Sequence, residues 1–168
     1  LPTRQVVFVN TSSASGPFVN DLSGPGRTII TATRSGAENF ATLFGGYFVD
    51  AVTGEEADAD KNRRVSMLEA FQFAKAAVGR AYDKEGLLAT EHAVLDDNGD
   101  KTASADPSVA GPDGKVAAVL SMGSAADAMP QSSGGLIVPC SRELFNIAWT
   151  RRLSIMMPAD AWHQRHVA

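Results

Sequence analysis

A run of apolar, mostly β-branched residues near the start of the chain constrains the fold most. Residues 5–9 read Gln-Val-Val-Phe-Val and are followed by Asn10 and a hydroxyl-rich turn that ends in Gly-Pro. A short apolar run without polar alternation is typical of a strand that is buried in a sheet. Residues 27–33, Arg-Thr-Ile-Ile-Thr-Ala-Thr, predict a second strand after the turn at residues 23–26.

The hydrophobic spacing then changes from that of a strand to that of a helix. In residues 38–52, aromatic and aliphatic side chains recur every four residues, at Phe40, Phe44, Phe48 and Val52, which predicts an amphipathic helix that stops at Gly54. Residues 66–86 predict a second helix, with a capping box at Ser66 and Glu69, a stop at Gly86 and an apolar stripe at Met67, Phe71, Ala74, Val78 and Ala81.

The order of these elements predicts an α/β fold with a short, mostly parallel sheet flanked by helices. Residues 96–114 are polar and turn-rich and predict a long loop, residues 115–120 a weaker third strand, and residues 136–138 a fourth strand or a packed segment. We expect one α/β domain over residues 1–129 and an irregular extension over residues 130–168.

Composition excludes several classes of protein. With 168 residues, 44% of them hydrophobic, the chain can bury a core, and no apolar run approaches the length of a membrane span. The single cysteine, Cys140, permits no internal disulfide and no cysteine-based zinc cluster. Residues 1–129 hold 11 basic and 17 acidic groups, and this acidic balance argues against a nucleic-acid partner.

The last 39 residues differ in composition from the rest. They hold four basic and two acidic groups, together with Cys140, both tryptophans, His163 and His166. Helical and strand periodicity are both weak there. The segment is interpreted as an extension that packs on the domain, with a partner-binding arm or a sequence foreign to the domain as alternatives.

Four hydroxyl residues follow the first predicted strand, Thr11, Ser12, Ser13 and Ser15. Ligands bind at the carboxyl ends of parallel strands, so Ser13 or Ser12 is a candidate nucleophile. His92, the only histidine before the extension, is the candidate base. The alternative is that the hydroxyls cap backbone groups of a turn and that His92 is a structural residue.

The same segment resembles the strand and loop that carry the nucleophile in caspase-like and legumain-like cysteine peptidases. Residues 6–16 read Val-Val-Phe-Val-Asn-Thr-Ser-Ser-Ala-Ser-Gly, and aligning Ser15-Gly16 with the family's Ser-Gly pair places Ser13 where the cysteine belongs. Residues 29–33 resemble the next strand of the family, with its Ala-Thr step. The resemblance covers roughly residues 5–100 and implies a caspase-like α/β fold.

The chain departs from the family at both catalytic positions. Serine stands at the nucleophile position, and the family's histidine lies on an earlier strand, before the point where this chain begins. A hydroxyl without a base is a poor nucleophile near neutral pH, so the resemblance implies a degenerate, non-catalytic domain. It also implies that another chain, or a missing N-terminal segment, completes the sheet beside residues 6–9.

Residues 58–69 carry oxygen donors at the spacing of an EF-hand or dockerin-like calcium loop. Donors at loop positions 1, 3, 5, 9 and 12, with a backbone carbonyl at position 7, would come from Asp58, Asp60, Asn62, Ser66, Glu69 and Arg64. Position 6 holds Arg63 where such loops have glycine. The alternative is a plain capping box preceded by solvated acids.

A second acidic alternation follows at Asp96, Asn98 and Asp100, with Gly99 between them. It suggests further calcium ligands, or a plain Asn-Gly turn. Calcium is therefore the expected cofactor, and because the ion is abundant outside the cytoplasm, we expect an extracytoplasmic location. The expected function is a non-catalytic, calcium-stabilised peptidase-like domain, and the alternatives are a serine-dependent esterase or peptidase and one segment of a cleaved or multi-chain peptidase.

Overall fold

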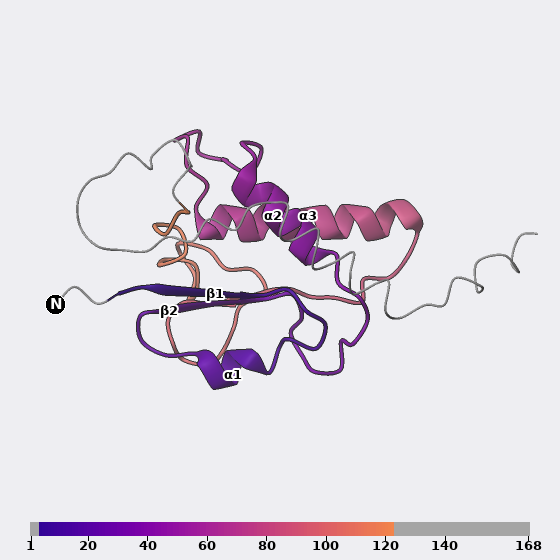
Figure 1. Ribbon diagram of the computed structural model, residues 1–168, viewed down its shortest axis with the longest axis horizontal. Coiled ribbons are helices and arrows are strands. Elements are labelled where there is room, and N and C mark those ends of the chain that lie inside the picture. Colours follow the sequence, from indigo (N-terminus) through magenta and orange to yellow (C-terminus); the bar gives the residue numbers. More distant parts are fainter. Residues whose placement is uncertain (1–3, 123–168) are drawn as a thin grey trace, which may run out of the picture. The chain divides into compact units, whose positions relative to one another are not determined.

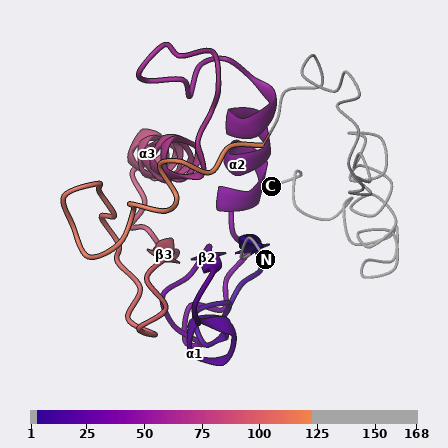
Figure 2. The ribbon, with the colours of Figure 1, turned by 90° about the vertical axis from the view of Figure 1, so that its left-hand side faces the viewer.

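The computed structural model describes residues 4–122. In these residues three strands form one sheet in the order β1-β2-β3, from β1 (Val6–Asn10), β2 (Arg27–Thr31) and β3 (Val94–Asp96). The helices are α1 (Phe18–Leu22), α2 (Phe44–Thr53) and α3 (Met67–Glu85). The helices α2 and α3 lie on one face of the sheet and α1 on the other, which gives three layers (Figures 1 and 2).

The sheet is mixed, which corrects the expected mostly parallel arrangement. β1 pairs parallel with β2 from Val6↔Arg27 to Asn10↔Thr31, and β2 pairs antiparallel with β3 from Ile29↔Asp96 to Thr31↔Val94. Strand β3 and helix α1 were not predicted, since three residues and five residues are too short to show a clear period. The α/β class itself is confirmed.

The core lies between the sheet and the two longer helices. Phe71 of α3 packs against Phe44, with ring centroids 5.9 Å apart, and Phe44 packs against Phe48, with centroids 5.7 Å apart. Ile30 and Leu95 of the sheet are fully buried beneath them. Ala70 and Ala74 of α3 are fully buried in the same core.

Helix α3 begins and ends where the sequence predicts. Ser66 and Glu69 form the capping box, and Gly86 closes the helix in the left-handed conformation, with φ 65°. Two carbonyls from a distant segment also cap the first turn, because Met67 N donates to Leu120 O and Leu68 N to Ala117 O.

Residues 115–120 form turns, so the third predicted strand is wrong. The carboxylate of Asp97 accepts hydrogen bonds from Val116 N and Ala117 N, both at 2.8 Å, and Ala117 O accepts from the N-terminus of α3. The backbone groups that a strand would give to a sheet therefore bond to a side chain and to a helix end.

Helix α2 begins at Phe44, six residues later than predicted. Both oxygens of Glu91, a buried residue, accept hydrogen bonds there, from Leu43 N at 2.7 Å and Phe44 N at 3.1 Å. A carboxylate at a helix N-terminus satisfies free N–H groups and interacts favourably with the helix dipole. The start of α2 is thus fixed by a residue 47 positions away in sequence.

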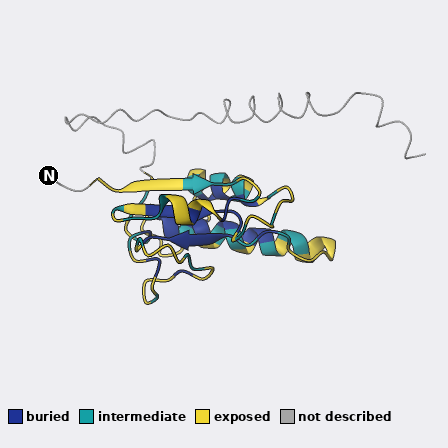
Figure 3. Cartoon of the chain, turned by 90° about the horizontal axis from the view of Figure 1, so that it is seen from below, coloured by how far each residue is buried: buried dark blue, intermediate teal, exposed yellow. Residues whose placement is uncertain are grey.

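Strand β1 lies at the edge of the sheet and pairs only with β2 among the described residues. The exposed fractions of Val6, Val7 and Phe8 are 53%, 37% and 37%. Figure 3 shows this edge largely in yellow, the colour of exposed residues. The expectation that another chain or an N-terminal segment completes the sheet stays a prediction. The expected strand at residues 136–138 and the extension lie outside the described residues.

Replacing Glu91 by alanine is expected to destabilise the domain by about 2 kcal/mol, because the N–H groups of Leu43 and Phe44 at the start of α2 lose a charged acceptor. Urea unfolding measures this change. Glu85→Ala, at an exposed position in the last turn of α3, is the matched control and is expected to change stability by less than about 0.5 kcal/mol. Equal effects of the two substitutions would contradict the role given to Glu91.

Candidate functional site

The loop after β1 that carries Thr11, Ser12, Ser13 and Ser15 is bound to the end of β2 through Ser15. Ser15 is fully buried, and its Oγ lies 3.1 Å from Thr33 Oγ1 and accepts from Thr33 N at 3.2 Å. Gly16 N donates to Thr33 Oγ1, and a Cβ at Gly16 would lie 2.3 Å from the carbonyl carbon of Arg34. Ser15 therefore binds the loop to the end of β2.

The two candidate nucleophiles are both exposed. Ser12 donates to the Asn10 side chain, with Oγ 2.7 Å from Oδ1, and its backbone N donates to the same oxygen. This is a local turn at the end of the strand. Among residues 4–122, Ser13 makes no side-chain hydrogen bond. The arrangement fits the alternative in which the hydroxyls serve turn structure.

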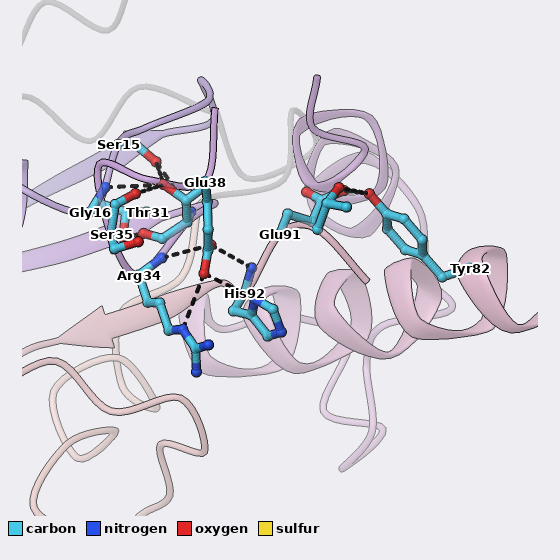
Figure 4. Close-up of polar contacts among 11 residues, drawn as sticks. Ser15, Gly16, Thr31, Arg34, Ser35, Glu38, Tyr82, Glu91 and His92 are labelled. Carbon is cyan, nitrogen blue, oxygen red and sulfur yellow. Dashed lines mark hydrogen bonds and ion pairs between the residues drawn. The ribbon is translucent and has the colours of Figure 1, made fainter. Parts of the chain in front are cut away.

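His92, the candidate base predicted from the sequence, lies next to the carboxylate of Glu38. Its Nδ1 is 3.0 Å from Glu38 Oε1, and its backbone N donates to Glu38 Oε2. Arg34 binds the same carboxylate through Nε and through its backbone N (Figure 4). Within the described part of the chain no hydrogen bond joins His92 to Ser12 or Ser13, so these predicted catalytic residues form no nucleophile–base pair.

A shallow hollow of about 340 Å³ lies beside α3, away from the predicted catalytic residues. It is lined by Phe71, Gln72, Lys75, Ala76, Ala105, Asp106 and Pro107. None of the candidate catalytic residues lines it, so it gives no support to hydrolysis at Ser13.

The acidic loop, residues 58–69, brings its carboxylates together. One oxygen from each of Asp58, Asp60 and Glu69 lies within 4.8 Å of the others. Asp58, at loop position 1, accepts from Asn62 N through Oδ1 and from Arg63 N through Oδ2. Asn62, at position 5, accepts from Arg64 N through Oδ1. The side chains at these two positions therefore hold the backbone of the loop in a turn.

Glu69 closes the acidic loop from the first turn of α3. Its Oε1 accepts from Ala59 N and Asp60 N, and its Oε2 accepts from the backbone N and the hydroxyl of Ser66. Burial raises the pKa of Glu69, but the hydrogen bonds from Ser66, Asp60 and Ala59 outweigh this and hold the pKa below its ordinary value. Glu69 is therefore ionised near neutral pH, as a metal ligand must be.

The backbone at loop position 6 adopts the conformation for which such loops use glycine. Arg63 has φ 69° and Lys61, at position 4, has φ 59°, both in the left-handed region. The loop therefore makes its sharp turn with a side chain present, at a cost of about 1–2 kcal/mol. Arginine at position 6, which the sequence marked as a departure from calcium loops, therefore adopts a left-handed conformation here.

The second predicted set of ligands, Asp96, Asn98 and Asp100, does not converge on one point, because Asp96 is buried and bound to a turn. Asp96 is fully buried and accepts from Gly99 N and Lys101 N, which closes a turn around Gly99 at φ 80°. Asn98 and Asp100 are exposed, and Asn98 Nδ2 donates to Asp100 Oδ2. These three side chains stabilise an Asn-Gly turn, which is the alternative that the sequence left open.

Comparisons with protein-family models, with curated proteins and with solved structures find no match to this chain. In residues 4–122 the structure contains no helix of the length and apolarity needed to cross a membrane.

Replacing Arg63 by glycine is expected to stabilise the domain by about 1 kcal/mol, since relief of left-handed strain exceeds the entropy that glycine adds to the unfolded chain. Arg64→Gly is the matched control, because Arg64 is not among the residues with positive φ, and it is expected to destabilise. Urea unfolding without added metal compares the two. A loss of stability in both variants would show that position 63 is not strained.

Proposed function

We propose that this chain is a non-catalytic, peptidase-like domain that binds calcium through the acidic loop and is stabilised by it. The observation that carries the proposal is the convergence of Asp58, Asp60 and Glu69 within 4.8 Å. Calcium is bound by six to eight hard oxygens, and a twelve-residue loop closed by a bidentate glutamate is one established way to supply them.

The fit of the residues to calcium extends beyond the three acids. Asn62 and Ser66 supply neutral oxygens at positions 5 and 9, and the carbonyl of Arg64 stands at position 7. The capping box holds Ser66 and Glu69 Oε2 at one end of the loop, and Glu69 Oε1 accepts from Ala59 N and Asp60 N. An ion bound among these oxygens would tie the chain before α3 to the first turn of the helix.

The non-catalytic part of the proposal is supported by the loop after β1. The hydroxyls of Ser12 and Ser15 bind the side chains of Asn10 and Thr33, and His92 is paired with Glu38 rather than with a serine. A serine nucleophile needs a base within hydrogen-bond reach. The order of a strand, a hydroxyl loop, a parallel strand and a helix agrees with the peptidase resemblance, which remains part of the proposal.

An extracytoplasmic location follows from the calcium proposal. A loop with three carboxylates, the one such group among residues 4–122, predicts modest affinity, and such sites fill where calcium is at millimolar concentration. The open edge of β1 supports the related possibility that the domain is one segment of a larger peptidase-like assembly. Pairing of that edge with another chain would appear as a stable complex by native mass spectrometry.

Added calcium is expected to raise the melting temperature, because it binds the folded state. A concentration 100 times the dissociation constant stabilises by about 2.7 kcal/mol. Asp58→Ala/Asp60→Ala is expected to remove this rise, and Asp106→Asn, at an exposed acid of the same domain, is expected to retain it. A melting temperature that calcium leaves unchanged in the unaltered protein would refute the proposal.

Ser13→Ala is expected to leave hydrolysis of ester and peptide substrates at the level of the unaltered protein, and that level is expected to equal the uncatalysed rate. The measurement is product release from a chromogenic ester and from a fluorogenic peptide. Hydrolysis that falls in Ser13→Ala and in His92→Ala would favour the serine-hydrolase alternative instead.

A further inference from the structure

The acidic loop also carries a group of exposed basic residues. Residues 59–64 read Ala-Asp-Lys-Asn-Arg-Arg, and all of them are exposed and lie outside helices and strands. In Figure 2 the loop between α2 and α3 extends away from the sheet, beyond α3. Lysine and arginine are the side chains that a protease with an acidic specificity pocket selects, and irregular exposed segments are where proteases cut folded domains.

The backbone hydrogen bonds of this segment are local. Asn62 N and Arg63 N donate to the carboxylate of Asp58, and Arg64 N donates to the side chain of Asn62. In the described part of the chain, the backbone of residues 61–64 forms no hydrogen bond with a residue outside the acidic loop. The segment can therefore open into the extended form that a protease binds without disturbing the core.

Backbone strain favours the same opening. Lys61 and Arg63 have φ 59° and φ 69°, in the left-handed region, which is unfavourable for residues with a side chain. An extended substrate has negative φ at every position, so the strain at both residues is released when the segment opens.

Lys101 provides a contrast within the same domain. It is also exposed and has φ 68°. Its backbone N, however, donates to the fully buried Asp96 and to the hydroxyl of Ser23, and a Cβ at Gly99 of the same turn would lie 2.8 Å from the backbone of Gly24. Opening this turn breaks contacts with a buried group and with a distant segment, so it is expected to resist cleavage.

Within residues 59–64, the bond after Arg63 is the most accessible to a protease of this kind. Arg64 is followed by Val65, which is half-buried, so the bond between them lies against the core. Lys61 is preceded by Asp60, whose negative charge opposes binding next to an acidic pocket. Arg63 has exposed residues on both sides.

We propose that the Arg63–Arg64 bond is a cleavage site for a protease that cuts after basic residues, and that calcium in the acidic loop protects it. Hydrolysis adds one water across the peptide bond and leaves a carboxylate on Arg63 and an amine on Arg64. The site itself is independent of the metal, and its protection rests on the proposed function.

Calcium and cleavage oppose each other for a physical reason. Opening of the segment removes the Asp58 and Asn62 oxygens from the ion, so bound calcium lowers the population of the open form on which the rate of cleavage depends. Cleavage in turn separates loop positions 1–6 from positions 7–12, so the cut protein no longer holds its calcium ligands on one chain.

The two pieces are expected to stay together after cleavage. Phe44 of α2 and Phe71 of α3 lie on opposite sides of the cut, and their ring centroids are 5.9 Å apart. Strand β2 also pairs with β3 across the cut, with Ile30 opposite Leu95. The product is therefore a folded two-chain domain.

The test is limited digestion of the full chain with trypsin, in chelator and in excess calcium, with the cut bonds identified by mass spectrometry. The rate of trypsin on a chromogenic peptide in each buffer corrects for its own response to calcium. In chelator, cleavage after Arg63 is expected to be at least about tenfold faster than after Lys101 or after Arg80, an exposed residue inside α3. Arg63→Gln is expected to remove the cut, and Arg64→Gln, the matched control, to retain it.

Calcium is expected to slow the cut after Arg63 at least about tenfold in the unaltered protein and in Asp106→Asn, but not in Asp58→Ala/Asp60→Ala. The cut protein is expected to elute as one species and to lose the calcium-dependent rise in melting temperature.

Cleavage after Lys101 or Arg80 as fast as after Arg63 would refute the site. If calcium raises the melting temperature but leaves the cleavage rate unchanged, its protective role is refuted and the proposed function stands. If calcium changes neither quantity while Arg63 is still cut first, the proposed function fails and the cleavage site remains.

Discussion

The hydrogen bonds at the first turn of α3 connect the segments on which the rest of the domain depends. Its free N–H groups donate to Leu120 O, Ala117 O and the hydroxyl of Ser66. The carboxylate of Glu69 in turn accepts from the backbone N of Ser66. The same glutamate binds the backbone of the acidic loop. One helix end therefore fixes a long amphipathic helix, the loop before it and the turns that follow β3.

The parts of the fold that could be predicted are those set by local chemistry. The capping box at Ser66 and the left-handed glycine at Gly86 mark α3 because each acts within one turn of the helix. The start of α2 and the turns at residues 115–120 could not be predicted, because Glu91 and Asp97 fix them from distant positions. A carboxylate that replaces a sheet partner leaves no periodic signal in the sequence.

The candidate sites divide in the same way. The spacing of Asp58, Asp60 and Glu69 predicted a cluster that the structure brings together, since all three act within one loop. At Asp96, Asn98 and Asp100 the same alternation produces a turn, because Asp96 points its oxygens at Gly99 N and Lys101 N. Asp113 gave no signal, since it lies 16 residues from Asp97 and only the fold brings its Oδ1 to Asp97 N.

Asp97 and the acidic loop are joined through a single turn of backbone. Asp97 holds Ala117 N, Ala117 O holds Leu68 N, and Leu68 precedes Glu69, the residue that closes the acidic loop. Two hydrogen bonds and one peptide unit therefore connect the buried carboxylate of Asp97 to Glu69. A domain built in this way uses carboxylates to secure the backbone of its irregular half.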